Sequence, residues 1–167
     1  MILCFVLLGF LSLNGTQVAQ SPSGVANASV DDLFEGYDHW SSQHPGVFPR
    51  GKTTELHVPS IDLYDPAGTS IYHGIDSETN AVFLNGLTKD IKVTKTSEFR
   101  PSLKEAIEMF SGLRAQEGTL LSDKRYTIFV LTYPNWDHCK SQNEAVARLR
   151  ERAVKIGIRI IEVRLHT

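Results

Sequence analysis

The C-terminal third of the chain carries the pattern that most limits its fold: a strand, a helix and a second strand in close succession. Residues 126–133 read YTIFVLTY, with β-branched or aromatic side chains on both alternating faces, which is typical of a buried central strand. Residues 140–156 show the periodicity of an amphipathic helix, and Gly157 ends it. Residues 158–165, IRIIEVRL, predict another strand. Two strands that flank one helix at this spacing imply a parallel pair joined by a right-handed crossover.

Length and composition place the chain among single globular domains. Its 167 residues suit one ordinary domain, and 41% apolar with 22% charged residues excludes wholesale disorder. The net charge of -2 provides no overall field that would collect nucleic acid or an anionic membrane, so neither is an expected partner. From Lys140 onward seven basic residues accompany three acidic ones, and we interpret them as ordinary salt-bridged surface.

The first residues determine the expected cellular compartment. Ile2 to Leu13 form an uncharged run of twelve residues, shorter than the roughly 20 that a helix needs to span a bilayer. That length fits the apolar region of a secretory signal peptide, so we predict an exported protein, periplasmic or secreted, with no stable membrane span after cleavage. A buried N-terminal strand is the alternative. Cleavage could follow the small residues at 26–28 or occur near Ala19.

Export would change the cysteine chemistry of the chain. Cys4 lies inside the apolar run and would be removed, which leaves Cys139 as the mature chain's only thiol and excludes an intramolecular disulfide. Residues 20–29 are small and polar and are typical of a linker. We therefore assign 1–28 to a signal peptide and linker, and 29–55 to an N-terminal helix and loop.

Two further segments carry helix signals. Residues 30–40 predict a short amphipathic helix that is capped by Ser29 or an aspartate. Residues 102–105 form a capping box that begins a second helix, and Gly112 is its expected stop.

A hairpin is predicted between residues 56 and 74. Two β-prone runs, SIDLY and TSIYH, flank the turn residues 65–68, in which proline presets the first turn angle and glycine accepts a positive φ. The apolar run 81–87 fits either a strand or a short helix, and 88–97 fits a loop or a weak strand.

The junction of the predicted strand with the predicted long helix is where chemistry could sit. Cys139 would meet unpaired backbone N–H groups and the positive end of the helix macrodipole, and both favour the thiolate. His138 and Lys140 could add to this effect. Asp137 acts in the opposite direction through its charge, or serves as the helix N-cap.

Trp136 to Lys140 read WDHCK, and this stretch resembles the redox motif of the thioredoxin superfamily, in which Trp-Cys-x-x-Cys-Lys follows a buried strand and opens a long helix. The attacking cysteine is absent here, so dithiol exchange cannot operate within this chain. Val58 to Gly68 resembles the N-terminal hairpin of the exported thioredoxin-like reductases, in which a strand with a D-x-x-G turn precedes the redox strand. It also resembles that family's hairpin after a cis-proline, with Pro59 in that role. The family has this hairpin after its first strand–helix–strand unit, whereas here it comes before.

The resemblance implies a thioredoxin-like three-layer α/β sandwich over residues 56–167. Its central mixed sheet would have helices on both faces, and the fold would be truncated or permuted. The family contacts its clients over the helix start. By resemblance, Trp136, Asp137, His138 and Cys139 would form an exposed rim there, and Pro59 and Lys140 would join the binding surface.

The expected function is that of an accessory or binding protein for a protein client, without a cofactor. The alternative is a single-cysteine oxidoreductase or peroxidase in which the Cys139 thiolate attacks a disulfide or peroxide with assistance from His138. A third hypothesis is a structural subunit that docks through the helix at 30–40.

No metal site is expected, because the histidines and cysteines lack ligand spacing. The histidines other than His138 are His39, His44, His57, His73 and His166.

Overall fold

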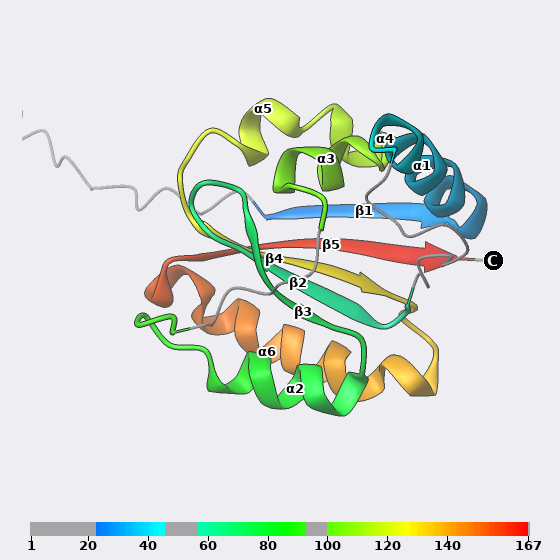
Figure 1. The fold of residues 1–167 in the computed structure, drawn as a ribbon. Coiled ribbons are helices and arrows are strands. Elements are labelled where there is room, and N and C mark those ends of the chain that lie inside the picture. Colours follow the sequence, from blue (N-terminus) through cyan, green and yellow to red (C-terminus); the bar gives the residue numbers. More distant parts are fainter. Residues whose placement is uncertain (1–22, 46–56, 93–99, 167) are drawn as a thin grey trace, which may run out of the picture.

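The computed structural model describes residues 23–45, 57–92 and 100–166, which fold into a five-stranded sheet with helices on both faces (Figure 1). The strands are β1 (Gly24–Ser29), β2 (Ser60–Tyr64), β3 (Ser70–Gly74), β4 (Tyr126–Thr132) and β5 (Ile158–His166). The α-helices are α1 (Val30–Gln43), α2 (Ser77–Gly86), α3 (Leu103–Glu108), α4 (Ser111–Arg114), α5 (Glu117–Leu120) and α6 (Lys140–Ile156). A 3-10 turn, η1 (Asp137–Cys139), precedes α6.

The sheet is mixed, with the strand order β1-β5-β4-β2-β3. β1, β5 and β4 run parallel, while β2 is antiparallel to both β4 and β3. The hairpin β2–β3 therefore completes the sheet beside β4, although it precedes β4 in the sequence. The predicted α/β sandwich, with a central mixed sheet and helices on both faces, is confirmed.

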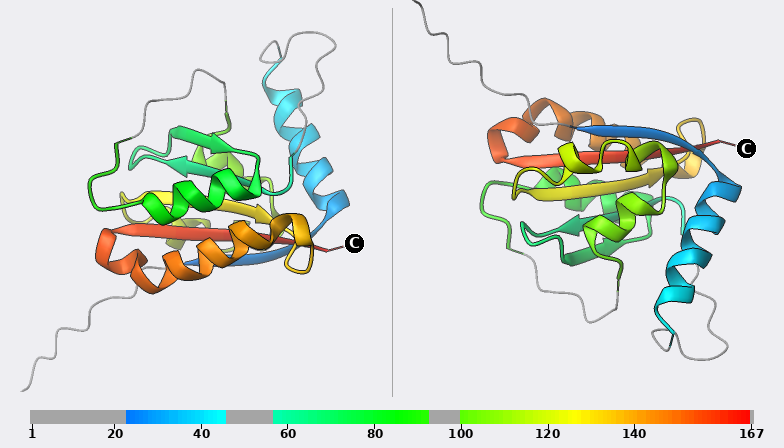
Figure 2. Two further views of the ribbon diagram at one scale, coloured as in Figure 1. Left: turned by 90° about the horizontal axis from the view of Figure 1, so that it is seen from below. Right: turned by 90° about the horizontal axis from the view of Figure 1, so that it is seen from above.

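Each face of the sheet has its own hydrophobic core, and Figure 2 shows the two helical layers from opposite sides. Leu149 and Val146 of α6 pack with α2 against Ile160 of β5 on one face. On the other face α1, α3, α4 and α5 cover Ile161 and Val163 of the same strand. Alternate residues of β5 thus enter opposite cores, as the period of a strand requires.

The predicted strand–helix–strand unit is confirmed. The helix occupies residues 140–156 as predicted, and Gly157 follows it with a φ of 75°. β4 and β5 are parallel, and six of the seven β4 residues are buried. In the hairpin, the Asp65 carboxylate accepts hydrogen bonds from the N–H groups of Ala67 and Thr69, both at 2.9 Å. Gly68 takes the expected positive φ of 81°.

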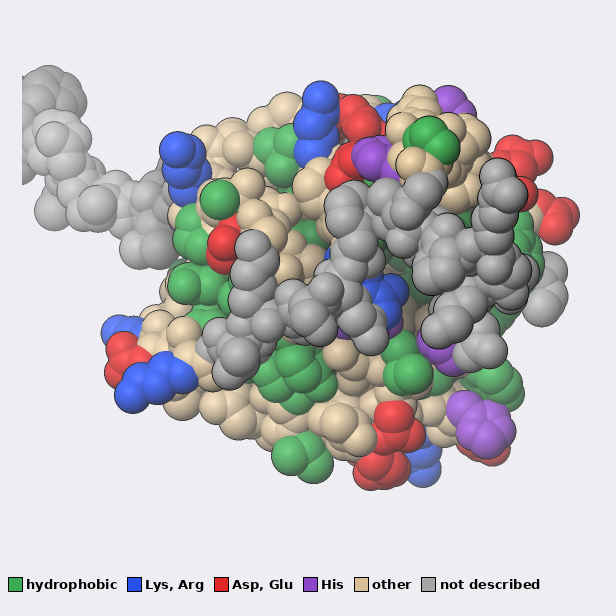
Figure 3. Space-filling view, viewed as in Figure 1, with side chains coloured by type: hydrophobic (Ala, Val, Ile, Leu, Met, Phe, Trp, Pro, Cys, Tyr) green, Lys and Arg blue, Asp and Glu red, His purple; other side chains and the backbone are tan. Residues whose placement is uncertain are grey.

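The first helix is confirmed, and it belongs to the core. The Ser29 hydroxyl accepts from the Asp32 N–H at 3.0 Å, and the Asp32 carboxylate accepts from the Ser29 N–H at 2.9 Å. Leu33 and Trp40 are buried beneath it. The acidic side chains of α1 are exposed, and Figure 3 shows acidic side chains at the end of the molecule where Figure 1 places α1. α1 is therefore part of the folded domain, which weighs against its being a separate docking element.

The linker prediction for residues 20–29 is wrong where the structure describes them, because Gly24–Ser29 form the edge strand β1. Ala26 and Ala28 are buried, and a Cβ built on Gly112 would lie only 3.2 Å from the Ala26 Cβ. The small residues that suggested a linker and a cleavage site are thus those that let α4 pack closely on β1. The sandwich therefore begins at Gly24 and includes β1 and α1, whereas it was predicted to span only residues 56–167.

Two other expectations change in the structure. The ambiguous run at 81–87 belongs to helix α2, which begins at Ser77 with Asp76 as its N-cap. Gly112 does not end the helix that begins at the capping box, since α3 ends at Glu108 and Gly112 lies within α4.

The predicted signal segment and Cys4 lie outside the described residues, as do residues 46–55 of the predicted N-terminal loop and residues 93–97 of the predicted loop or weak strand. Residues 88–92 form neither helix nor strand. Within the described ranges, none of the helices has the length and apolar character needed to cross a bilayer.

We predict that Leu149→Ala lowers the free energy of unfolding by about 2–5 kcal/mol, because it leaves a cavity at a fully buried position of α6. Val154→Ala on the same helix removes a side chain that is 49% exposed and should change stability by less than about 0.5 kcal/mol. Urea denaturation of both variants measures the difference. Equal effects would contradict the packing of α6 described above.

Candidate functional site

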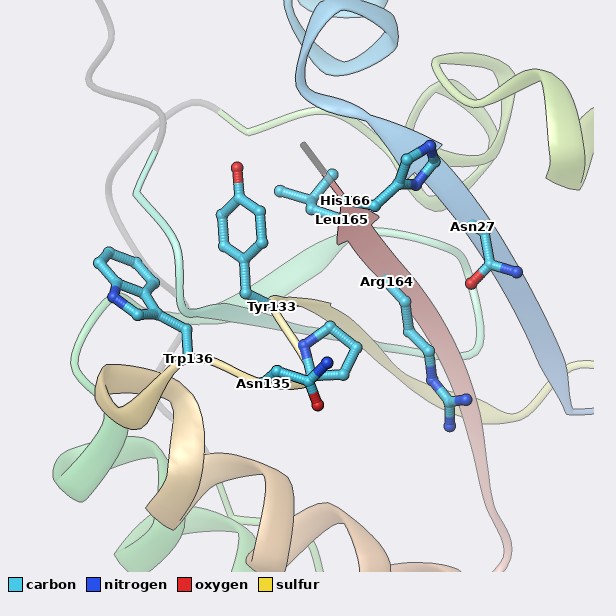
Figure 4. A pocket seen from close by; sticks show the side chains of 8 residues that line it. Asn27, Tyr133, Asn135, Trp136, Arg164, Leu165 and His166 are labelled. Carbon is cyan, nitrogen blue, oxygen red and sulfur yellow. The ribbon is translucent and has the colours of Figure 1, made fainter.

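The carboxyl ends of the three parallel strands converge on a pocket with a volume of about 600 Å³. In open α/β sheets, ligands bind preferentially beyond the carboxyl ends of such strands. β1 contributes Asn27, β5 contributes Arg164 and His166, and the loop after β4 contributes residues 133–136. In Figure 4 Arg164 and Asn27 lie on one side, the rings of Tyr133 and Trp136 lie on the other, and Asn135 lies between.

Strand register brings the polar residues of this pocket together. Asn27 pairs with Arg164, and Arg164 pairs with Thr132, so the three occupy one row across β1, β5 and β4. Residues paired in this way point to the same face of a sheet. On this face Val25 of β1 is 44% exposed, and Asn27 is also exposed. The pocket is therefore open on its β1 side.

The pocket carries a positive charge. Arg164 donates through Nε to Glu162 at 2.7 Å, and the Glu162 side chain is only 8% exposed. Arg150 of α6 pairs with the same carboxylate. Two guanidinium groups share one carboxylate, which leaves a net charge of +1, and no acidic side chain lines the pocket. Burial, and then the like charge of Arg164, lower the pKa of Arg150.

The loop between β4 and α6 presents an aromatic surface. Trp136 is 45% exposed, and its ring packs edge-on against Tyr133, with 5.6 Å between centroids. The His138 ring packs against the same indole, with 4.9 Å between the ring centroids. Asp137 and His138 are exposed, as expected for the rim, and Lys140 is exposed as well. Asp137 and Lys140 line a second hollow of about 350 Å³, which shares residues 134–136 with the first pocket.

The prediction that Cys139 belongs to this exposed rim is wrong, because the residue is 0% exposed and its thiol is free. The 3-10 turn η1 ends at Cys139, whose N–H donates to the Trp136 carbonyl at 2.8 Å. This turn exposes the two residues before Cys139 and places Cys139 itself in the interior. Asp137 does not cap the helix; neither η1 nor α6 has a side-chain cap from its own N-cap residue.

A buried amide pair holds the start of α6 against the sheet. Gln142 is fully buried, donates through Nε2 to the Leu131 carbonyl at 3.3 Å, and accepts from Asn80 of α2 at 2.6 Å. The backbone N–H of Gln142 donates to the Ser77 hydroxyl at 3.0 Å, so a residue of α2 caps α6. These contacts fix the end of β4 and therefore the loop that follows it.

Pro59 lies at the same end of the sheet but lines neither hollow. It is buried, the peptide bond that precedes it is cis, and Ser60 pairs with Leu131 near the end of β4. Three polar residues of the pocket, Arg164, Asn27 and Asn135, were not predicted as site residues from the sequence. The signal that could have found Arg164 is its position at the carboxyl end of a predicted parallel strand.

Among the described residues, no group of three histidine, cysteine or acidic side chains could hold a metal ion. His73 instead pairs with Asp62 at 3.0 Å, and His44 pairs with Glu105 at 3.0 Å.

Comparison with known proteins identifies no relative: no protein-family model, curated protein or solved structure matches this chain.

We predict that Gln142→Ala lowers the free energy of unfolding by about 1–3 kcal/mol, because it leaves the Asn80 amide and the Leu131 carbonyl buried without this partner. Gln116→Ala removes an exposed glutamine that also bonds a backbone carbonyl, and should cost less than about 0.5 kcal/mol. A thermodynamic cycle with Asn80→Ala, measured in urea, should show coupling between Asn80 and Gln142. Additive effects would refute the network.

Proposed function

We propose that this chain is a thioredoxin-like binding or accessory module that holds a protein client at the loop between β4 and α6 and performs no thiol chemistry. The observation that carries the proposal is the contrast within this loop, where Trp136 is 45% exposed and Cys139 is 0% exposed. An exposed aromatic residue beside a pocket is a common anchor for protein partners. A thiol without access to solvent cannot attack a disulfide or a peroxide.

The arrangement of the sheet supports the thioredoxin-like part of the proposal. A parallel strand–helix–strand unit lies beside an antiparallel hairpin, and Pro59 precedes that hairpin next to the end of β4. The thioredoxin-like resemblance implies these same spatial neighbours in a different chain order. The family assignment is a proposal that rests on this arrangement and on the WDHCK stretch.

The burial of Cys139 weighs against the alternative of a single-cysteine oxidoreductase. His138 lies at the surface, packed against Trp136, and so assists no exposed thiol in this arrangement. Export to the periplasm or the exterior stays a prediction from the segment Ile2 to Leu13.

We predict that Cys139 resists alkylation by iodoacetamide in the folded protein and reacts once the protein is unfolded in guanidinium, because its side chain is fully buried. The measurement is mass spectrometry of a Cys4→Ser variant, in which Cys139 is the only thiol. Native reaction as fast as that of free cysteine would favour the oxidoreductase and contradict a binding module without thiol chemistry.

We predict that the protein binds a subset of peptides on an array of random dodecamers, and that Trp136→Ala weakens this binding by about tenfold, as loss of an interface aromatic does. The matched control is Val82→Ala on α2, which removes an apolar side chain that is 74% exposed far from the loop in sequence. If no peptide binds, or if both variants bind like the wild type, the binding surface is not at this loop.

A further inference from the structure

The outer edge of β1 is available for pairing. β1 is the terminal strand of the sheet and pairs with β5 on one side only (Figure 2). In the described part of the chain, no backbone hydrogen bond outside the β1–β5 ladder involves residues 24–28. The N–H and C=O groups on the outer side of an edge strand are a template for an added strand. An extended peptide can therefore continue this sheet.

A strand added at this edge would lie next to the pocket. Val25 and Asn27 point to the α6 face and are exposed, so they would neighbour the side chains of the added strand on that face. Adjacent strands are about 4.8 Å apart, so the added strand would lie about 10 Å from β5. The side chains of Arg164 on β5 and of an acidic residue in the peptide extend toward each other over Asn27. Together they are long enough to span the distance between the two strands.

The charge of the pocket indicates that its partner is acidic. Its lining contains Arg164, the amides Asn27 and Asn135, and no carboxylate. Glu162 engages Arg164 through Nε alone, and the terminal nitrogens of Arg164 have no partner among the described residues. Arginine in this state suits a carboxylate, which accepts charge-assisted hydrogen bonds from a guanidinium.

We infer that the client segment is an extended, acidic peptide that adds as a strand to the outer edge of β1 and directs an aspartate or glutamate side chain to Arg164 and Asn27. This inference rests on the proposed binding function and names its ligand class. We assign the carboxylate to a side chain within the segment and not to the C-terminus of the peptide. The pocket is open to solvent beyond β1, so the added strand can continue past it.

The test is fluorescence anisotropy with a fluorescein-labelled nonapeptide of alternating threonine and valine, with one central glutamate and an amidated C-terminus. Saturable binding is expected, with about tenfold weakening in Arg164→Gln, as loss of a charge-assisted pair predicts. The matched control is Arg148→Gln, an arginine of α6 that pairs with Glu144 and does not line the pocket; it should bind as the wild type does.

A second variant keeps the test valid if Arg164→Gln fails to fold. Asn27→Asp alters an exposed side chain, leaves the two arginines on Glu162, and should weaken binding by placing a like charge beside the peptide carboxylate. Replacing the peptide's glutamate by glutamine should weaken wild-type binding as much as Arg164→Gln does. N-methylation of alternate amides on one side of the peptide should abolish binding, since strand addition needs those donors.

Several results would overturn the inference. They are no saturable binding of the probe, equal binding by the Arg164→Gln or Asn27→Asp variant, no effect of N-methylation, binding that requires a free C-terminal carboxylate, or self-association of the protein through β1 in sedimentation. If the binding of peptides on the array depends on Trp136 but not on Arg164, that result would support the proposed function and contradict only the inference that the ligand is an acidic strand. Absence of array binding overturns the proposed function itself.

Discussion

The packing of α6 across β4 and β5 is the contact on which the rest of the structure depends. Leu149 of α6 is fully buried against the apolar residues of both strands, and the partners are close in sequence, so little chain entropy opposes their meeting. α2 then packs on α6, and its Asn80 completes the buried amide pair with Gln142. Because this pair fixes where α6 begins, it also fixes the β4–α6 loop that carries Trp136.

The parts of the fold that were predictable from the sequence are those with local signals. The strand at 126–133, the helix at 140–156 and the hairpin turn each have their own periodicity or turn chemistry. β1 has none, because strand formation by glycine and alanine depends on pairing with β5 rather than on propensity. In the site, the exposure of Trp136 was expected from the resemblance to the thioredoxin superfamily and not from a local pattern. The row of Asn27 and Arg164 could not be predicted, because it requires a strand register that only tertiary structure defines.

The burial of Cys139 shows how a short turn alters the chemistry of a loop. A cysteine at the first turn of a helix is activated only if a reagent can reach it. Here η1 precedes α6, exposes Asp137 and His138, and seals Cys139. The surface left by this turn offers an aromatic ring, amides and a cation, but no exposed thiol. That combination supports recognition and provides no group for disulfide exchange.

The Glu162 carboxylate, which pairs with both Arg150 and Arg164, explains why an arginine, and not a lysine, suits the pocket. Glu162 is nearly buried, and a buried carboxylate is unfavourable unless it is paired. Arg150 pairs with it from α6, and Arg164 engages it through Nε alone. A guanidinium can give Nε to this internal contact and keep its terminal nitrogens for a ligand, whereas an ammonium has a single nitrogen for both. The contact with Glu162 thus orients Arg164 in the free protein, which would lower the entropy cost of binding the proposed acidic peptide.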